Sequence, residues 1–190
     1  DGTGRLSRTC RRRCRVRDRK TGFKPQLDIY CETHAYGETE IMTDNSKKAC
    51  ADALSNVLAN TYVLYLKTHN YHWNVEGSNF RSLHLMFEEQ YQEMWTALDE
   101  IAERIRALGE YAPGTYEKFV ELATIKENQD IPVAKDMLAE LLADNEKIIA
   151  IIVEAIKVAQ DAGDESSADQ LIGRQTAHEK AAWMMRSTLA

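Results

Sequence analysis

The sequence predicts an all-α protein in which four long helices form a bundle and a short extra helix, expected at Tyr116–Thr124, lies in the central crossover connection. Apolar residues recur at three- and four-residue steps in four long segments, which is the period of amphipathic helices. A long connection separates the second segment from the third. No segment alternates β-branched and polar residues over the length of a strand, so no sheet is expected.

The first two long helices are expected to be neighbours joined by a short loop. The first is expected from Ser46 to about Trp73, on a stripe of alanine, leucine, valine and tyrosine residues. Ser78 or Asn79 can cap the second helix, because their side chains can accept a hydrogen bond from a free backbone N–H. The second helix is expected to stop at Gly109.

The last two long helices follow the connection. Asp130 is expected to cap the third, with Pro132 in its first turn and Gly163 just past its end. Ser166 and Asp169 fit a capping box for a fourth helix that runs to the C-terminus. Four helices with one long central connection are the ferritin-like arrangement of a four-helix bundle.

Charge is divided unevenly along the chain and indicates two parts. The whole chain has a formal net charge of −6, but residues 1–24 hold ten basic and two acidic side chains, a net of +8. Residues 42–190 hold 14 basic and 24 acidic side chains, a net of −10. We therefore expect a ferritin-like domain over residues 42–190 and a basic segment of different composition over residues 1–41.

Two interpretations of residues 1–41 stay open. They form a disordered basic arm that binds polyanions, or they are an extension outside the natural protein. The chain begins with Asp1 and its first methionine is Met42, which favours the extension. The candidate DNA-binding residues are Arg11, Arg12, Arg13, Lys47 and Lys48.

Composition argues against several classes of protein. No apolar run approaches the roughly 20 residues of a membrane-spanning helix. The arginine-rich start has no apolar segment after it, so it is not a secretory signal. All four cysteines lie in the first 50 residues and are expected outside the core. This usage indicates a reducing compartment, so a cytoplasmic protein is expected.

Polar residues interrupt the apolar stripe of the second long helix and are candidate metal ligands. They are His84, Glu88, Asp99 and Glu103, and they fall within an arc of about 100° around the helix. A solvated helix face would also explain them, but the same arc carries large apolar groups such as Trp95. Carboxylates in such surroundings need a cation, and few basic residues share the arc, so a metal ion is favoured.

One helix cannot bring these four residues to one ion. The pair His84 and Glu88 lies about 16 Å along the helix axis from the pair Asp99 and Glu103. Positions 84 and 103 have the same midpoint as positions 88 and 99, at residues 93–94. An antiparallel pairing of this helix with its own copy about that midpoint would form two identical sites, each built from both subunits of a two-fold homodimer.

His72 is the fifth candidate ligand. It ends the first helix, twelve residues before His84, and can approach the same site from the neighbouring helix. Two imidazoles with three carboxylates suit Fe(II), Mn(II) or Zn(II). His69 is expected at the surface or behind the ligands, and His34 and His178 have no partner in the sequence.

Two motifs carry all five candidate ligands. The first is His72-Trp73-Asn74-Val75-Glu76-Gly77, followed by Phe80, His84 and Phe87-Glu88-Glu89. The second is Asp99-Glu100-Ile101-Ala102-Glu103-Arg104. From about Ser46 to its C-terminus the chain resembles the Dps family, the DNA-binding proteins from starved cells or mini-ferritins of the ferritin-like superfamily.

The resemblance implies an assembly and a site. The assembly is a hollow dodecamer of four-helix subunits with 23 symmetry, and the site holds two irons, as Fe2+ or Fe3+, at each two-fold interface. His72, His84 and Glu88 would come from one subunit, and Asp99 and Glu103 from its partner. Many members have Asp where this chain has Glu88, so metal geometry and affinity can differ here.

The resemblance also implies ferroxidase activity. Fe(II) would be oxidised, preferably by hydrogen peroxide, and stored as ferric mineral, which protects DNA from oxidative damage. Trp73 resembles a tryptophan beside the family's site that intercepts oxidising equivalents, although core packing would also explain it. The candidate iron-entry pore residues are Asp161, Asp164, Glu165 and Asp169.

Two other functions compete with this one. In the first alternative, the protein is mainly a DNA-compacting, nucleoid-associated bacterial protein that acts through the basic arm. In the second, it is a ferritin-like bundle without an active iron site that serves as a scaffold or binding protein. DNA affinity depends mainly on cationic contacts, and residues 42–190 carry a net charge of −10. We therefore expect weak DNA binding from a chain that starts at Met42, and stronger multivalent binding when residues 1–24 are present.

Overall fold

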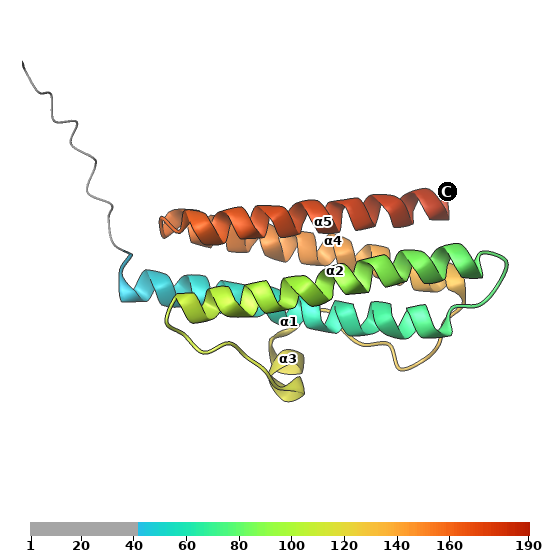
Figure 1. The fold of residues 1–190 in the computed structure, drawn as a ribbon, viewed down its shortest axis with the longest axis horizontal. Helices are drawn as coiled ribbons and strands as arrows, with labels where there is room; N and C mark the ends of the chain where they lie inside the picture. Colours follow the sequence, from blue (N-terminus) through green and yellow to red (C-terminus); the bar gives the residue numbers. More distant parts are fainter. Residues whose placement is uncertain (1–41) are drawn as a thin grey trace, which may run out of the picture. The chain divides into compact units, whose positions relative to one another are not determined.

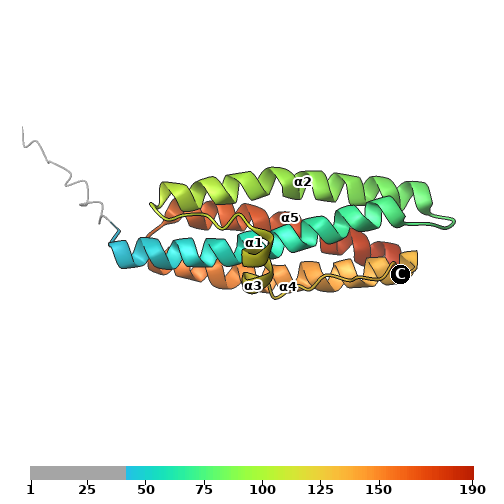
Figure 2. The ribbon, with the colours of Figure 1, turned by 90° about the horizontal axis from the view of Figure 1, so that it is seen from below.

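The computed structural model describes residues 42–190, which form an all-helical bundle. The helices are α1 (Asp44–Asn74), α2 (Phe80–Ala107), α3 (Tyr116–Leu122), α4 (Ala134–Asp161) and α5 (Glu165–Leu189). The four long helices run side by side, and α3 packs against α1 from the connection between α2 and α4 (Figures 1 and 2). No strand occurs in this part of the chain. The predicted four-helix fold with a short crossover helix is confirmed. The predictions for residues 1–41 lie outside the described residues.

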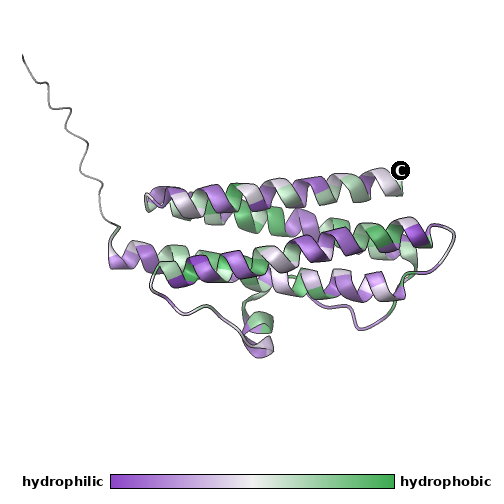
Figure 3. Cartoon of the chain, in the orientation of Figure 1, coloured by the Kyte–Doolittle hydropathy of each residue, from purple (hydrophilic) through white to green (hydrophobic). Residues whose placement is uncertain are grey.

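The apolar stripes of the long helices meet along the centre of the bundle. Hydrophobic and hydrophilic residues alternate around each long helix (Figure 3). The largest fully buried apolar side chains include Leu54, Leu64, Phe87, Ile101, Ile105, Met137, Leu141, Ile148, Ile152 and Leu171. The prediction that every cysteine lies outside the core is wrong for Cys50, which is 1% exposed. Cys50 lies one turn before Leu54, so the apolar stripe of α1 includes it. No described helix is both long and apolar enough to span a bilayer.

Helix α4 begins at Ala134, later than the expected cap at Asp130. The residue before Pro132 is disfavoured in the helical conformation, so a helix starting at Asp130 would be interrupted at once. The side chain of Asn128 instead accepts a hydrogen bond from the Asp130 N–H, at 3.0 Å, in a turn ahead of the helix. Val133 is the residue that precedes the first helical turn.

Helix α5 is capped by Asp164, not by Ser166 with Asp169. The Asp164 carboxylate accepts a hydrogen bond from the Ser167 N–H at 3.1 Å, which satisfies one of the free donors of the first turn. The Arg104 guanidinium of α2 donates to the same carboxylate at 2.5 Å. This ion pair joins the end of α2 to the start of α5.

Asn60 fastens the crossover connection to α1. Its side chain is fully buried, and its Oδ1 accepts hydrogen bonds from the backbone N–H groups of Thr124 at 2.9 Å and Ile125 at 3.0 Å. These two residues follow α3, where no helix or strand supplies backbone partners. One buried side chain therefore satisfies two donors of the connection.

We expect Asn60→Leu to lower the free energy of unfolding by about 2–4 kcal/mol, because it leaves buried N–H groups without an acceptor. Urea denaturation followed by far-ultraviolet circular dichroism measures the change. Asn74→Ala is a matched control on the exposed end of α1 and should stay within about 0.5 kcal/mol of the unchanged protein. Equal losses in the two variants would contradict the assignment.

Candidate metal centre

Three candidate ligands come together where α1 meets α2. His72 lies in the last turn of α1, and His84 and Glu88 lie one turn apart near the start of α2. One ligand atom from each lies within 4.8 Å of the others. His72 is buried, and the other two side chains are half-buried. The short loop between the helices folds the chain back and places the end of one helix beside the start of the next.

The two histidines hold each other by reciprocal hydrogen bonds. The Nδ1 of His72 donates to the backbone carbonyl of His84, and the Nδ1 of His84 donates to the backbone carbonyl of His72, both at 2.8 Å. The rings stack with their centroids 3.8 Å apart and their planes 19° apart. A carbonyl can only accept, so each Nδ1 carries a proton, and in the neutral ring Nε2 is then the nitrogen with a lone pair for a metal ion. This tautomer is the one that binds a metal ion through Nε2.

Glu88 adds an anionic oxygen to these two nitrogens. The Gln92 side chain donates to its carboxylate at 3.3 Å from the next turn of α2. Within residues 42–190, no lysine or arginine forms an ion pair with Glu88, Asp99 or Glu103. A carboxylate that has no protein cation, beside two imidazole nitrogens, forms a set suited to Fe(II), Mn(II) or Zn(II).

Asp99 and Glu103 are not part of this cluster within one chain. Both side chains are exposed on α2, and Asp99 lies eleven residues after Glu88 in this helix. A rigid helix of this length holds the two groups about 16 Å apart. Their contribution to the same site therefore requires a second copy of the chain and stays a prediction.

Aromatic rings cover the surface beside the cluster. His69 stacks on Tyr91 with a centroid distance of 3.9 Å, and it packs at a tilt against Trp73 with a centroid distance of 4.0 Å. Trp73 and Trp95 are each 60% exposed, so packing within the subunit does not account for Trp73. Burial, followed by the nearby His72, lowers the pKa of His69, which favours a neutral ring. Large exposed aromatic side chains are typical of an interaction surface.

The acidic residues expected at a pore lie around the junction of α4 and α5. Asp161, Glu165 and Asp169 are exposed. Asp164 is 4% exposed, and its carboxylate is bound by the Arg104 side chain and the first turn of α5. The negative charge of Asp164 is therefore neutralised by Arg104 within the subunit. Asp161, Glu165 and Asp169 remain the candidates for a path along which cations enter.

The candidate DNA-binding residues fall in two places. Arg11, Arg12 and Arg13 lie outside the described residues. Lys47 and Lys48 are at the start of α1 and pair with acids of the same helix: Lys47 with Asp44 at 3.6 Å, and Lys48 with Asp52 at 2.9 Å. These local pairs reduce the positive field that DNA phosphates would meet.

Polar residues that the sequence analysis did not single out pair inside the bundle. The Lys67 ammonium of α1 donates to Asp144 of α4 at 2.6 Å, and the Tyr71 hydroxyl donates to Glu140 at 2.5 Å. Burial of its ring is the main cause that raises the pKa of Tyr71. Bundle interiors are frequent places for metal ions, but here a lysine supplies the cation. Lys67 lies on the same face of α1 as Leu64, which is fully buried. A lysine on the apolar face of a helix indicates a buried ion pair, so the sequence could have predicted this one.

A second polar network links buried residues of α4 and α5 to the exposed Glu93 of α2. The Arg174 guanidinium of α5 donates two hydrogen bonds to Glu93 of α2, and Arg174 also contacts His178 at 3.2 Å. The His178 Nδ1 lies 2.9 Å from the Asn145 side-chain oxygen, so this nitrogen donates. Burial, with Arg174 second, lowers the pKa of His178 to about 3.

The buried His178 predicts a specific loss of stability in acid. Between pH 6.5 and 3 the unfolded chain takes up a proton on this residue and the folded chain does not, so stability falls as pH falls through this range. From pH 7 to pH 5 the loss from this group is about 2 kcal/mol. We expect His178→Gln to lose correspondingly less when urea midpoints are compared at these two pH values. Identical pH dependence of the two proteins would rule out this role.

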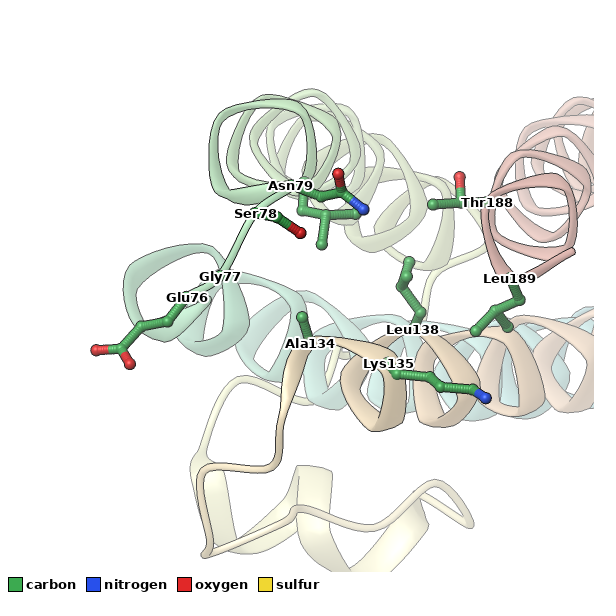
Figure 4. A pocket seen from close by; sticks show the side chains of 10 residues that line it. Glu76, Gly77, Ser78, Asn79, Ala134, Lys135, Leu138, Thr188 and Leu189 are labelled. Atoms are coloured by element: carbon green, nitrogen blue, oxygen red, sulfur yellow. The ribbon is translucent and has the colours of Figure 1, made fainter.

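An open surface pocket of about 350 Å³ lies at the end of the bundle, apart from the three clustered ligands. It is lined by the loop from Glu76 to Asn79, the start of α4 and the end of α5, including Thr188 (Figure 4). Glu76 is the one carboxylate in the lining, and Figure 4 shows its side chain pointing away from the pocket. None of the histidines in residues 42–190 lines this pocket, so these residues do not form a competing metal site there.

A family profile of the ferritin-like domain matches residues 51–190. With the four-helix bundle and its histidine and carboxylate cluster, this match defines a ferritin-like protein. Dps from Staphylococcus aureus has a solved structure that is 41% identical, with a TM-score of 0.72 over 74% of this chain and 95% of that one. A DPS protein from Vibrio cholerae is 30% identical, with a TM-score of 0.76 over 78% and 94% of the two chains.

Curated relatives agree with the solved structures. DNA protection during starvation protein 2 of Bacillus anthracis is 37% identical over 142 residues, covering 75% of this chain and 97% of its own length. An uncharacterised low-temperature-induced protein of Nostoc sp. is 41% identical over 148 residues, covering 77% and 83%. The chain belongs to the Dps family of mini-ferritins, as the sequence motifs predicted.

Proposed function

We propose that the protein is a ferroxidase and iron store that oxidises Fe(II), preferably with hydrogen peroxide, and keeps ferric mineral inside a dodecameric shell. The observation that carries the proposal is the reciprocal bonding of His72 and His84, which leaves two Nε2 atoms free beside the Glu88 carboxylate. The Vibrio cholerae protein is described as a member of a broad superfamily of ferritin-like diiron-carboxylate proteins, which supports iron as the metal.

In this proposal Fe(II) is the substrate, with two ions per site. His72, His84 and Glu88 hold the ions from one subunit, and Asp99 and Glu103 approach from a second subunit. Anionic oxygen ligands favour Fe(III) over Fe(II), so the site makes the ions easier to oxidise. Two adjacent Fe(II) ions can supply both electrons that one peroxide needs, which avoids the one-electron step that releases hydroxyl radical.

The exposed acids at the α4–α5 junction would draw Fe(II) toward the interior. Asp161, Glu165 and Asp169 carry no basic partner within residues 42–190. Repeated around a shell, they create a negative field that raises the local concentration of cations.

Anaerobic titration of Fe(II)-loaded protein with hydrogen peroxide tests this function. We expect two Fe(II) ions to be oxidised for each peroxide consumed, and light scattering to give the mass of about twelve chains. A monomer, or Fe(II) oxidation no faster than in buffer, would contradict the proposal. Repeating the titration with oxygen measures the preference between oxidants.

A second candidate function, DNA compaction and protection, rests on the +8 charge of residues 1–24. The Bacillus anthracis relative is named for DNA protection during starvation. Twelve basic segments on one shell would bind DNA by many weak contacts, in the bacterial cytoplasm and nucleoid. Gel-shift assays of chains 1–190 and 42–190 should show salt-sensitive retardation of DNA by the long form only. Strong retardation by the short form would overturn this assignment.

A further inference from the structure

The two imidazole rings of the cluster lie face to face, which limits how they can share metal ions. The rings of His72 and His84 are stacked, with centroids 3.8 Å apart and planes 19° apart. A histidine binds a metal ion in the plane of its ring, along the lone pair of one nitrogen, at a distance of about 2.1 Å. Two planes with this separation and angle meet far beyond that distance. One ion therefore cannot lie on both lone pairs, and each histidine offers a place for an ion of its own.

Hydrogen bonds hold the rings in this arrangement. Each Nδ1 donates to the backbone carbonyl of the other residue at 2.8 Å. Turning either ring toward a shared ion would break one of these bonds and separate the stacked faces. His72 is also buried, so packing limits its movement further. The two histidines thus present two separate binding directions.

Glu88 is placed to serve both histidines. One of its carboxylate oxygens lies within 4.8 Å of a ring nitrogen of His84, on the same helix, and of His72, on α1. Helices α1 and α2 lie side by side in Figures 1 and 2. Ligand atoms that share an ion lie at most about 4.2 Å apart, the sum of two bonds of about 2.1 Å, so small side-chain adjustments suffice. Among the described residues, only Gln92 donates a hydrogen bond to this carboxylate, at 3.3 Å.

The length of this side chain departs from the usual family pattern. Many members of the Dps family have Asp where this chain has Glu88. Aspartate is one methylene shorter, so its carboxylate would lie about 1.5 Å closer to the backbone of α2. A carboxylate withdrawn in this way stays near His84 and moves away from His72 on the neighbouring helix. The extra methylene of Glu88 is therefore what lets one carboxylate reach both histidines.

We propose that Glu88 bridges two metal ions, one on His72 and one on His84, so that one subunit holds the pair without carboxylates from a second subunit. The proposal rests on the proposed function and adds an order to it. One subunit first collects both Fe(II) ions, and Asp99 and Glu103 of a second subunit then complete the site for oxidation. Two dications in such a site, about 3.5–4 Å apart, repel each other, and a carboxylate that contacts both offsets part of the repulsion.

Anaerobic titration of the full-length protein with Co(II) tests the bridge, because Co(II) binds nitrogen and oxygen ligands more tightly than Fe(II) does. The variant Asp99→Ala with Glu103→Ala removes the carboxylates that a second subunit would supply. We expect it to bind two Co(II) ions per chain at the cluster, counted by isothermal titration calorimetry. Co(II) bound elsewhere, including by residues 1–41, is subtracted with the variant that also has His72→Ala and His84→Ala. Electron paramagnetic resonance should show that the two ions are exchange-coupled.

Glu88→Asp in the same background keeps the negative charge and shortens the side chain. We expect it to bind no more than one Co(II) per chain at the cluster, without exchange coupling. Glu89→Asp is the matched control, because Glu89 is an exposed carboxylate next to Glu88, and it should leave two coupled ions. Circular dichroism and light scattering check that all variants keep the fold and the assembly.

Three results would overturn the bridge: a single Co(II) per chain with Glu88 present, two ions without coupling, or two coupled ions with Glu88→Asp. Failure of the proposed function looks different, because the unchanged protein would then bind the coupled pair and still oxidise Fe(II) no faster than buffer. Rapid Fe(II) oxidation by the unchanged protein, with only one Co(II) in the Asp99→Ala, Glu103→Ala variant, would exclude the bridge alone.

Discussion

Two double variants, His72→Ala with Glu88→Ala and Asp99→Ala with Glu103→Ala, should each lose peroxide-dependent Fe(II) oxidation by at least about 100-fold. Coexpressed, they should regain about one quarter of wild-type activity. In a two-subunit site each mixed dimer has one site that carries both defects and one site that carries neither. Random pairing makes half of the dimers mixed, and half of the sites in those dimers are intact.

The controls for this experiment lie on the same helix. Glu89 and Glu100 are exposed carboxylates next to the candidate ligands, and Glu89→Ala with Glu100→Ala should keep full activity. Mass measurements should show the same assembly for all variants. Recovery of no activity in well-assembled mixtures would mean that one subunit supplies every ligand. Full activity in either double variant alone would show that the altered pair does not bind the metal.

The fold was predictable because the signal is repeated many times. Each long helix has a stripe of apolar residues at helical spacing, so a single misjudged position changes little. The starts of α4 and α5 were less predictable, because several residues in each stretch can cap a helix. Asp164 is the residue that caps α5, and its carboxylate also accepts a hydrogen bond from Arg104 of α2. That contact spans 60 residues and has no local signature.

The candidate site was predictable in composition and not in detail. Spacing along α1 and α2 placed His72 near His84 and Glu88, and the structure brings these three side chains together. The reciprocal histidine bonds depend on where the loop between the helices places two backbone carbonyls, which side-chain patterns do not reveal.

The interior ion pair gives the second large effect. We expect Lys67→Met to lower the free energy of unfolding by about 3–5 kcal/mol at pH 7.5, because it leaves the Asp144 carboxylate buried without a partner. Side-chain exposure is only 7% for Lys67 and 15% for Asp144. Lys48→Met is the exposed counterpart, since Lys48 pairs with Asp52 in water, and it should change the free energy of unfolding far less than Lys67→Met does.

The pH dependence identifies the cause of that loss. Burial raises the pKa of Asp144 and outweighs the lowering effect of Lys67, so removal of the lysine raises this pKa further. Because the pKa of this carboxyl is raised in the folded state, the loss of stability from its buried charge is complete at pH values above that pKa. The loss disappears as the pH falls and the carboxyl takes up a proton. Lys67→Met should therefore lose less stability at pH 5 than at pH 7.5, as measured by urea midpoints. Adding Asp144→Leu removes the buried charge and should restore most of the loss at both pH values. A loss that stays the same with pH and is not reversed by Asp144→Leu would point to the missing packing of the lysine stem instead.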